Sequence, residues 1–209
     1  MITSKLLIKS LNNMEKSMAK NKELLTALDA KIGDGDHGIN MNKGFKAVGA
    51  KLEDLKGDSC DKILKTVAMT LISTVGGASG PLYGTAFLKA AGVVEGDSIS
   101  DEKLIDVFSA AIGGVQLRGK AEKGEKTMLD ALIPAYEIFK EAIESGESLE
   151  VALEKSVGAA LEGVEYTKTI IATKGRASYL GERSLGHQDP GATSSYLLLK
   201  ALYETISED

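Results

Sequence analysis

The sequence predicts an all-α protein, a bundle or barrel of antiparallel helices. Apolar residues recur at intervals of three and four along most of the chain, which is typical of helices with one buried face. The glycines fall mainly in short runs between these periodic segments, where they would form loops. Only residues 169–173 have the composition of a β-strand, and they could also extend a helix. We therefore expect about eight helices in a single domain over residues 1–209.

The helical pattern begins near the N-terminus. Four apolar residues between 7 and 18 are spaced by four, three and four positions, so they share one helix face. A short helix is expected over about residues 21–30, and the next carries an apolar stripe from 41 to 55. Asp58 is a candidate N-cap for the helix that follows, because its carboxylate can accept from free backbone N–H groups. Pro81 suits the first turn of a further helix, where a missing N–H costs nothing.

The second half of the chain continues in the same way. Ser100, Thr127 and Ser148 each precede an apolar stripe and are candidate N-caps. Pro134 should kink the helix that follows Thr127, because proline removes one backbone donor. Asp189 is followed by proline, which is typical of a cap and a first helical position, so the last helix should run from there to about residue 206.

Composition excludes several classes of protein. The net charge of −5 and the pI of about 5.3 argue against a general nucleic-acid binder. No apolar stretch approaches the ~20 residues of a membrane span, and the N-terminus lacks the layout of a signal peptide. The single cysteine, Cys60, cannot form an internal disulfide, so we expect a reducing cytoplasm. Asp58 and Asp61 beside it should raise the thiol pKa, which favours a structural thiol.

Three aspartates, Asp29, Asp34 and Asp36, lie within eight residues and suggest a metal site. Without a cation such carboxylates repel one another, whereas Mg²⁺ prefers oxygen ligands and leaves room for phosphate oxygens. The alternative is a solvated acidic turn, because aspartate and glycine are ordinary turn residues. An EF-hand is excluded, since the fifth and sixth positions counted from Asp34 are Gly38 and Ile39. We interpret the cluster as a site for Mg²⁺ and phosphate.

Four glycine-rich loops extend this interpretation, at residues 33–38, 76–81, 118–127 and 174–191. The first, second and fourth run into expected helix N-termini, whose free N–H groups and positive dipole suit phosphate. Ser79 adds a hydroxyl donor in the second loop. The fourth loop is long for a compact domain and is typical of a lid or binding loop.

The cations of these loops are candidate phosphate ligands. The motif G-x-x-x-x-G-K ends at Lys120, but alanine follows it and a helix precedes it, so it is not a P-loop. Lys120 and Lys126 still remain candidate phosphate contacts. Arg176 is a candidate ligand because arginine binds phosphate in bidentate fashion, whereas Arg183 could simply be solvated. His37 follows Asp36 directly and is interpreted as a phosphate or nucleotide contact.

Taken together, these segments give the chain a family resemblance. It resembles the nucleotide-binding L subunit of bacterial dihydroxyacetone kinase over residues 32–38, 76–81, 118–122 and 174–193. The resemblance implies a barrel of antiparallel helices with the nucleotide, ADP or ATP, at one end. It also implies two Mg²⁺ ions held by Asp29, Asp34 and Asp36. The implied nucleotide contacts are His37, Gly38, Ile39, Asn40, Ala78, Ser79, Gly119, Met128, Arg176, Asp189, Pro190 and Gly191.

The resemblance implies partner subunits as well. A separate K subunit would hold dihydroxyacetone, and the length near 209 residues favours the version in which a phosphotransferase-system M subunit recharges bound ADP. A homodimer is compatible with the sequence, whereas no nucleic-acid or membrane partner is expected. Two alternatives stay open: an ATP-dependent kinase subunit for dihydroxyacetone or another ketose, and a non-enzymatic nucleotide-sensing partner.

Overall fold

The computed structural model describes residues 1–208 and confirms the all-α prediction. Two short 3₁₀ segments, η1 (Thr167–Thr169) and η2 (Arg176–Ser184), precede the last helix. A two-residue antiparallel ladder pairs β1 (Ile2–Thr3) with β2 (Ser98–Ile99). The α-helices within these residues are α1 (Ser4–Lys20), α2 (Lys22–Ile32), α3 (His37–Leu52), α4 (Cys60–Thr74), α5 (Ser79–Ala91), α6 (Asp101–Gly119), α7 (Leu129–Glu144), α8 (Leu149–Tyr166) and α9 (Pro190–Ser207).

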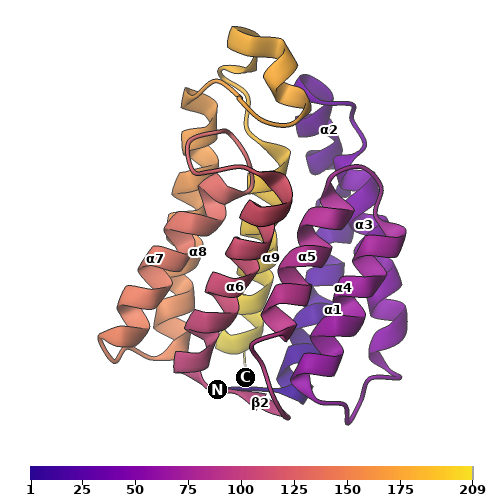
Figure 1. Cartoon of the computed structure of the whole chain (residues 1–209), viewed down its shortest axis with the longest axis vertical. Coiled ribbons are helices and arrows are strands. Elements are labelled where there is room, and N and C mark those ends of the chain that lie inside the picture. The colour runs from indigo at the N-terminus through magenta and orange to yellow at the C-terminus, as the bar shows by residue number, and fades with distance from the viewer. Residues whose placement is uncertain (209) are drawn as a thin grey trace.

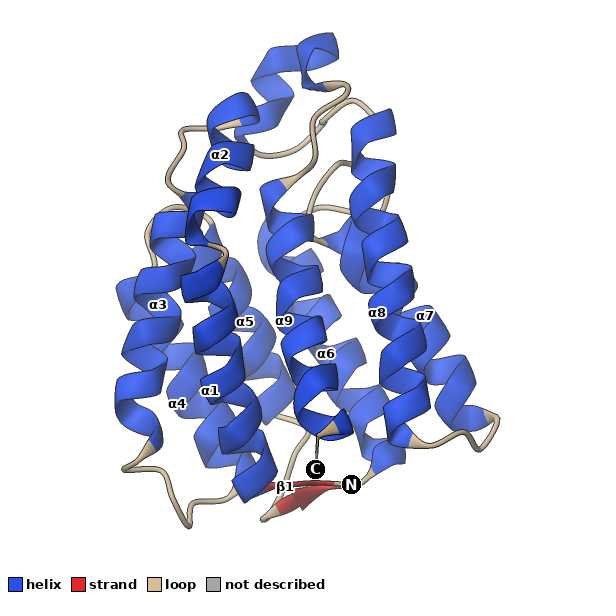
Figure 2. Cartoon of the chain, turned by 180° about the vertical axis from the view of Figure 1, so that it is seen from behind, coloured by secondary structure: helices blue, strands red, loops and turns tan. Residues whose placement is uncertain are grey.

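Eight of these helices form a closed barrel. Each packs against its neighbour in the order α1, α3, α4, α5, α6, α7, α8, α9, and α9 packs back against α1. The helices run alternately up and down, and the shorter α2 lies at one end of the barrel (Figure 1). The β1–β2 ladder lies at the other end, together with the N-terminus and the end of α9 (Figure 2). The apolar stripes point inward, and one continuous core cluster extends from Ile2 to Ala201.

Most predicted helix starts are confirmed, but the predicted caps at Asp58 and Thr127 are wrong. The side chains of Ser100, Ser148 and Asp189 accept hydrogen bonds from the backbones of their first turns. Asp58 does not cap α4, because the helix begins one residue later, after Ser59. The Asp58 carboxylate instead lies 2.7 Å from Lys62 Nζ.

Three further details differ from the expected pattern. Thr127 lies one residue before the N-cap of α7, and its hydroxyl accepts from Leu129 N at 3.2 Å. Residues 169–173 do not extend α8 as an α-helix and do not pair as a strand, since a 3₁₀ turn is followed by extended backbone. The β1–β2 ladder was not predicted, because two residues are too few to give an alternating pattern.

Within residues 1–208, no helix combines the length and the apolar character that a bilayer span requires.

Four helices of the barrel begin at the same end. The up-and-down order places the first residues of α3, α5, α7 and α9 at the end opposite the β1–β2 ladder (Figure 1). Residues 33–36 and the segment from 170 to 189 lie at that end as well. The barrel thus collects the predicted glycine-rich loops around one opening.

The packing of α7 against α8 provides a test of the barrel. A Cβ added to Gly163 would lie 2.0 Å from the backbone oxygen of Asp130, so the two helices touch at this glycine. We expect Gly163→Ala to lower the free energy of unfolding by about 1–3 kcal/mol, because the helices must separate. Gly158 lies on α8 with open space beside it. Gly158→Ala should instead stabilise the chain by up to about 1 kcal/mol through helix propensity. Urea denaturation measures both, and equal effects would contradict the close contact.

Candidate functional site

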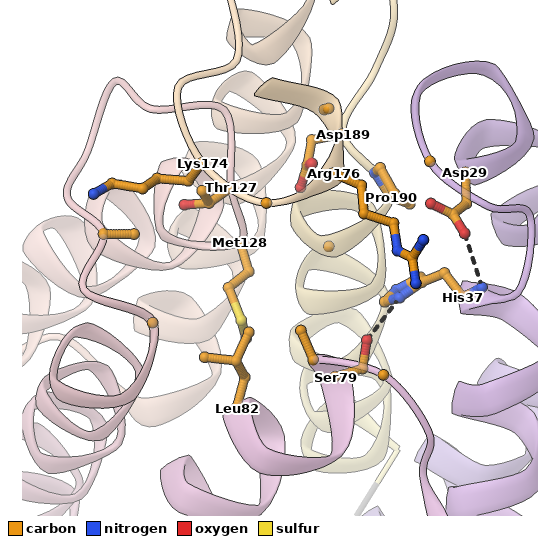
Figure 3. Close-up of a pocket in the computed structure, with 18 of the residues that line it drawn as sticks. Asp29, His37, Ser79, Leu82, Thr127, Met128, Lys174, Arg176, Asp189 and Pro190 are labelled. Carbon is orange, nitrogen blue, oxygen red and sulfur yellow. Dashed lines mark hydrogen bonds between the residues drawn. The ribbon is translucent and has the colours of Figure 1, made fainter. Parts of the chain in front are cut away.

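The open end of the barrel contains a cavity of about 560 Å³. Its lining comes from the ends of α2 and α6, the beginnings of α3, α5, α7 and α9, and the long loop before α9 (Figure 3). Loop residues as far apart in the sequence as Gly33 and Gly191 therefore meet around one space. A cavity of this size is in the range of small-molecule and cofactor sites.

Four helix N-termini face this cavity. His37 begins α3, Ser79 begins α5, Leu129 begins α7 and Pro190 begins α9, and all four residues line the cavity. The first turn of a helix leaves N–H groups without intrahelical partners and carries the positive end of the helix dipole. Their convergence makes the cavity favourable for an anionic group such as phosphate.

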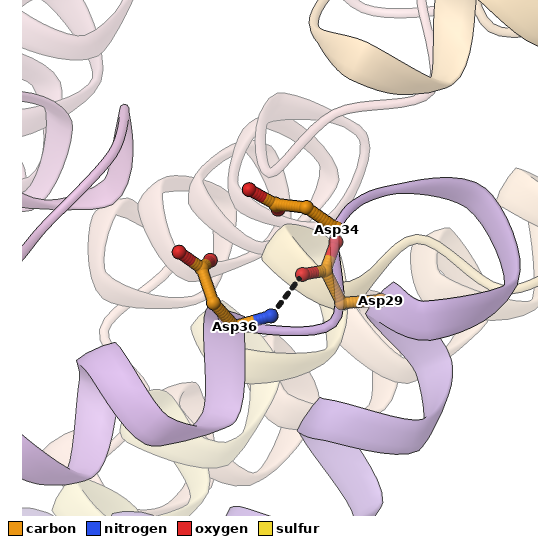
Figure 4. Close-up of side chains that lie close together, drawn as sticks. All are labelled: Asp29, Asp34 and Asp36. Carbon is orange, nitrogen blue, oxygen red and sulfur yellow. Dashed lines mark hydrogen bonds between the residues drawn. The ribbon is translucent and has the colours of Figure 1, made fainter.

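Three carboxylates gather beside these positive ends. Oxygens of Asp29, Asp34 and Asp36 all lie within 4.8 Å of one another (Figure 4). Asp29 accepts from the backbone N–H groups of Asp36 and His37 at 2.9 and 3.1 Å, which fixes its carboxylate at the start of α3. Gly33 is required there, because a Cβ would lie 2.0 Å from Asp29 Oδ1. The oxygen ligands and their spacing fit a hard divalent cation.

Arg176 already interacts with this acidic cluster. Its Nη2 lies 2.9 Å from Asp34 Oδ2, while its side chain remains 68% exposed. The arginine is placed by Gly175, whose φ of 63° bends the chain at the start of η2. Such an exposed ion pair is weak. Arg176 can therefore exchange Asp34 for another anion in the cavity.

His37 ties three helix N-termini together. Its Nδ1 lies 3.0 Å from Ser79 Oγ on α5, and its Nε2 lies 2.8 Å from Ser194 Oγ on α9. Burial lowers the pKa of His37, although Asp29 and Asp36 oppose the shift. Both ring nitrogens face hydroxyl groups, so His37 holds the site in shape and contacts the cavity with one edge.

Sequence reasoning missed Ser194, a partner of His37, and the tyrosine that contacts Ser194. Tyr83 Oη on α5 lies 2.6 Å from Ser194 Oγ, 2.9 Å from Ser195 Oγ and 3.2 Å from Gly191 O. Burial raises the pKa of Tyr83 to about 12. Tyr83 and Ser194 are separated by 111 residues, so no local pattern could have joined them.

Lys126 has a structural role that the sequence did not suggest. It lines the cavity, but its side chain is buried and its ammonium donates to the backbone oxygens of Thr167, Ile170 and His187. The predicted phosphate contact by Lys126 is not supported, because these three carbonyls already occupy its donors. Lys126 instead joins the two ends of the segment from 167 to 187 through these hydrogen bonds. Lys120 ends α6 in a left-handed conformation and does not line the cavity.

Asp189 lies beside Lys126 at the start of α9. Its carboxylate accepts from Ala192 N at 2.7 Å and so caps the helix. Burial raises the pKa of Asp189 to about 7. Gly191 follows closely, and a Cβ there would approach Asp189 Oδ2 to 3.1 Å. Aspartate at 189 is thus explained by the cap of α9, and glycine at 191 by its close approach to the Asp189 carboxylate.

The structure brings most of the predicted site residues together. Gly38, Ile39 and Asn40 do not line the cavity. Gly38 lets α3 pack against α2, since a Cβ would lie 2.1 Å from Lys22 O, and Ile39 is 49% exposed. Their contact with nucleotide stays a prediction. The predicted residues that do line the cavity are Asp29, Asp34, Asp36, His37, Ala78, Ser79, Gly119, Met128, Arg176, Asp189, Pro190 and Gly191.

An apolar wall completes the cavity and was largely missed by sequence reasoning. Leu82, Val115, Met128 and Leu129 line it, and Figure 3 shows Leu82 and Met128 on the side away from Asp29. Leu82, Val115 and Leu129 lie within helices, so only the fold reveals that they face the cavity, whereas Met128 was an expected nucleotide contact. The site therefore combines one charged side with one apolar side, which suits a ligand with an anionic part and a flat apolar part.

Comparison with known proteins identifies the family. The profile of the DAK2 domain matches residues 31–204. The chain is 49% identical to the "PEP-dependent dihydroxyacetone kinase, ADP-binding subunit DhaL" of Escherichia coli, with 86% of each chain covered. It is 42% identical to the "PTS-dependent dihydroxyacetone kinase, ADP-binding subunit DhaL" of Lactococcus lactis, over 99% of this chain and 100% of the relative.

A solved structure shares the fold. The dihydroxyacetone kinase of C. freundii, determined in complex with AMP-PNP and Mg²⁺, superposes with a TM-score of 0.73 at 23% identity. The match covers 95% of this chain, which spans only 33% of the length of that kinase. With the family profile and the two close relatives, it follows that the chain belongs to the DAK2 domain family, together with the ADP-binding subunits of dihydroxyacetone kinases.

Proposed function

We propose that the chain is the nucleotide-binding subunit of a dihydroxyacetone kinase that depends on phosphoenolpyruvate. The observation that carries the proposal is the convergence of four helix N-termini and three aspartates on one cavity. That arrangement suits a Mg²⁺-bound diphosphate or triphosphate. The printed names of the close relatives support ADP as the nucleotide and phosphoenolpyruvate as the ultimate donor.

The cavity accounts for both parts of a nucleotide. The phosphates would lie over the beginnings of α3, α5 and α9, where backbone N–H groups and the Ser79 hydroxyl can donate to their oxygens. The base would lie against the apolar wall formed by Leu82, Val115 and Met128. Arg176 stands at the mouth and can leave Asp34 for a phosphate oxygen, which guanidinium binds in bidentate fashion.

Asp29, Asp34 and Asp36 would hold Mg²⁺ against the phosphates. The resemblance implies two ions, and three carboxylates suffice for two because Mg²⁺ keeps several water ligands. When bound, the metal offsets the charge that develops on the transferring phosphoryl group. Asp29 is the best fixed of the three, because the α3 backbone already holds its carboxylate.

The reaction requires partner proteins. Phosphoryl transfer to the C1 hydroxyl of dihydroxyacetone needs a base near that hydroxyl, and none of the cavity residues stands free for this role. We propose that a separate K subunit holds the ketose and supplies the base, and that a phosphotransferase-system M subunit rephosphorylates ADP in place. We also propose a cytoplasmic location, because the single cysteine, Cys60, is a buried free thiol and cannot form an internal disulfide.

Reconstitution tests the function as a whole. The chain is mixed with Mg²⁺, ADP, dihydroxyacetone, the K subunit and phosphorylated M subunit, and dihydroxyacetone phosphate is measured. We expect product without added ATP, and retention of ADP by the chain after extensive dialysis. Product only with free ATP would favour the ATP-dependent alternative, and no product with either donor would contradict the proposal.

Loss of one carboxylate should greatly slow the reaction. We expect Asp34→Asn to lower the transfer rate by about a hundredfold or more, because a metal ligand is lost while the fold is retained. The rate is measured in the reconstituted system, and circular dichroism checks folding. Asp106→Asn removes an exposed carboxylate on α6 that pairs with Lys103 and does not line the cavity, so this control should keep the wild-type rate. Equal rates for both variants would argue against the metal site.

Arg176→Gln should change two affinities in opposite directions. Without nucleotide, Arg176 competes with a cation for Asp34, so its removal should strengthen Mg²⁺ binding by up to about fivefold, as expected for an exposed ion pair. ADP binding should weaken by about tenfold or more, because a charged hydrogen bond to phosphate is lost.

Isothermal titration calorimetry measures both affinities on the same protein. Arg183→Gln is the matched control, because Arg183 lies exposed on the same loop and does not line the cavity. This control should leave both affinities unchanged. A loss of Mg²⁺ affinity in Arg176→Gln would show that Arg176 supports the acidic cluster and does not compete for it.

A further inference from the structure

A chain of hydroxyl groups connects Tyr83 to Ser79 through the imidazole of His37, beside the cavity. Tyr83 Oη lies 2.9 Å from Ser195 Oγ and 2.6 Å from Ser194 Oγ. Ser194 Oγ lies 2.8 Å from His37 Nε2, and His37 Nδ1 lies 3.0 Å from Ser79 Oγ. Tyr83, His37 and Ser79 all line the cavity, and Ser79 alone among the five residues is partly exposed.

The direction of these hydrogen bonds decides what Ser79 offers to a ligand. A neutral imidazole carries one N–H, so it donates at one nitrogen and accepts at the other. If His37 accepts at Nε2, it donates from Nδ1 to Ser79, and the hydroxyl proton of Ser79 is free for the cavity. In the opposite direction Ser79 donates to the ring and presents only oxygen lone pairs, which repel phosphate.

Tyr83 and Ser194 favour the first direction. A phenol is a better donor than an aliphatic hydroxyl, and Ser194 is the closest partner of Tyr83. When Tyr83 donates to Ser194, the proton of Ser194 can go to His37 Nε2 at 2.8 Å or to Gly191 O at 3.1 Å. The shorter contact leads to His37.

We propose that Tyr83 and Ser194 are positioning residues that orient the hydrogen bonds of His37, so that Ser79 can donate its hydroxyl proton to a phosphate oxygen of the bound nucleotide. The proposal rests on the proposed function for the identity of the ligand. The direction of the hydrogen bonds is a property of the chain alone. The two parts can therefore be tested separately.

Nitrogen NMR of the histidine rings tests the direction without nucleotide. The chain has two histidines, and a His187→Gln variant leaves only the signals of His37. We expect the proton of His37 on Nδ1 in the otherwise wild-type chain. Tyr83→Phe removes the donor to Ser194, so Ser194 can turn to Gly191 and the proton should move to Nε2. A proton on Nε2 before this substitution would overturn the proposal.

A double-mutant cycle tests the consequence for binding. Ser79→Ala and Tyr83→Phe should each weaken Mg²⁺–ADP binding by about tenfold, because each removes one donor to a charged oxygen. The double variant should bind no more weakly than Ser79→Ala alone, since Tyr83 acts through Ser79. Additive losses would overturn the proposal, because Tyr83 would then support the fold in another way.

A control separates this outcome from a general effect of removing a tyrosine hydroxyl. Tyr136 lies on α7, packs edge-on against Phe108 and does not line the cavity. Tyr136→Phe should leave both the His37 signals and the ADP affinity unchanged. If the unmodified chain binds no Mg²⁺–ADP in calorimetry, the proposed function fails and the role of Ser79 fails with it. The NMR result then still decides the direction of the hydrogen bonds.

Discussion

The arrangement of the site depends on the balance between negative carboxylates and positive helix ends at the open end of the barrel. Three carboxylates of like sign lie within 4.8 Å of one another, next to the positive ends of four helices. The helix ends favour anions, and the carboxylates favour cations. A metal ion with a bound phosphate satisfies both at once, because the metal faces the carboxylates and the phosphate faces the helices. Without them, Arg176 supplies part of the missing positive charge.

The closed ring of helices holds the carboxylates and the helix ends in place. Each helix of the ring packs on two neighbours, and the core cluster extends over most of the chain. The loops at the open end are fastened to the ring by buried polar contacts: Lys126 holds the backbone before α9, and His37 joins α3, α5 and α9. The hydrogen bonds of Lys126 and His37 thus hold the site together, although the aspartates within it repel one another.

The sequence predicted the parts of this structure that depend on local pattern. The apolar stripes, the caps at Ser100, Ser148 and Asp189 and the acidic cluster are all encoded within a few residues. What it could not predict depends on contacts between distant segments, such as the pairing of Tyr83 with Ser194 or the burial of a lysine among carbonyl groups. The error at Asp58 arose because two adjacent residues could each cap α4, and the carboxylate instead pairs with a lysine one turn along.

The short ladder between β1 and β2 has a consequence for how the protein can be used. It lies at the end of the barrel opposite the cavity, where α1 begins and α9 ends (Figure 2). A tag, a fluorescent protein or a surface tether joined to the N-terminus would therefore extend away from the mouth. Immobilised in this way, the barrel would present its opening to solution, so that small ligands and large protein partners could both reach it unhindered.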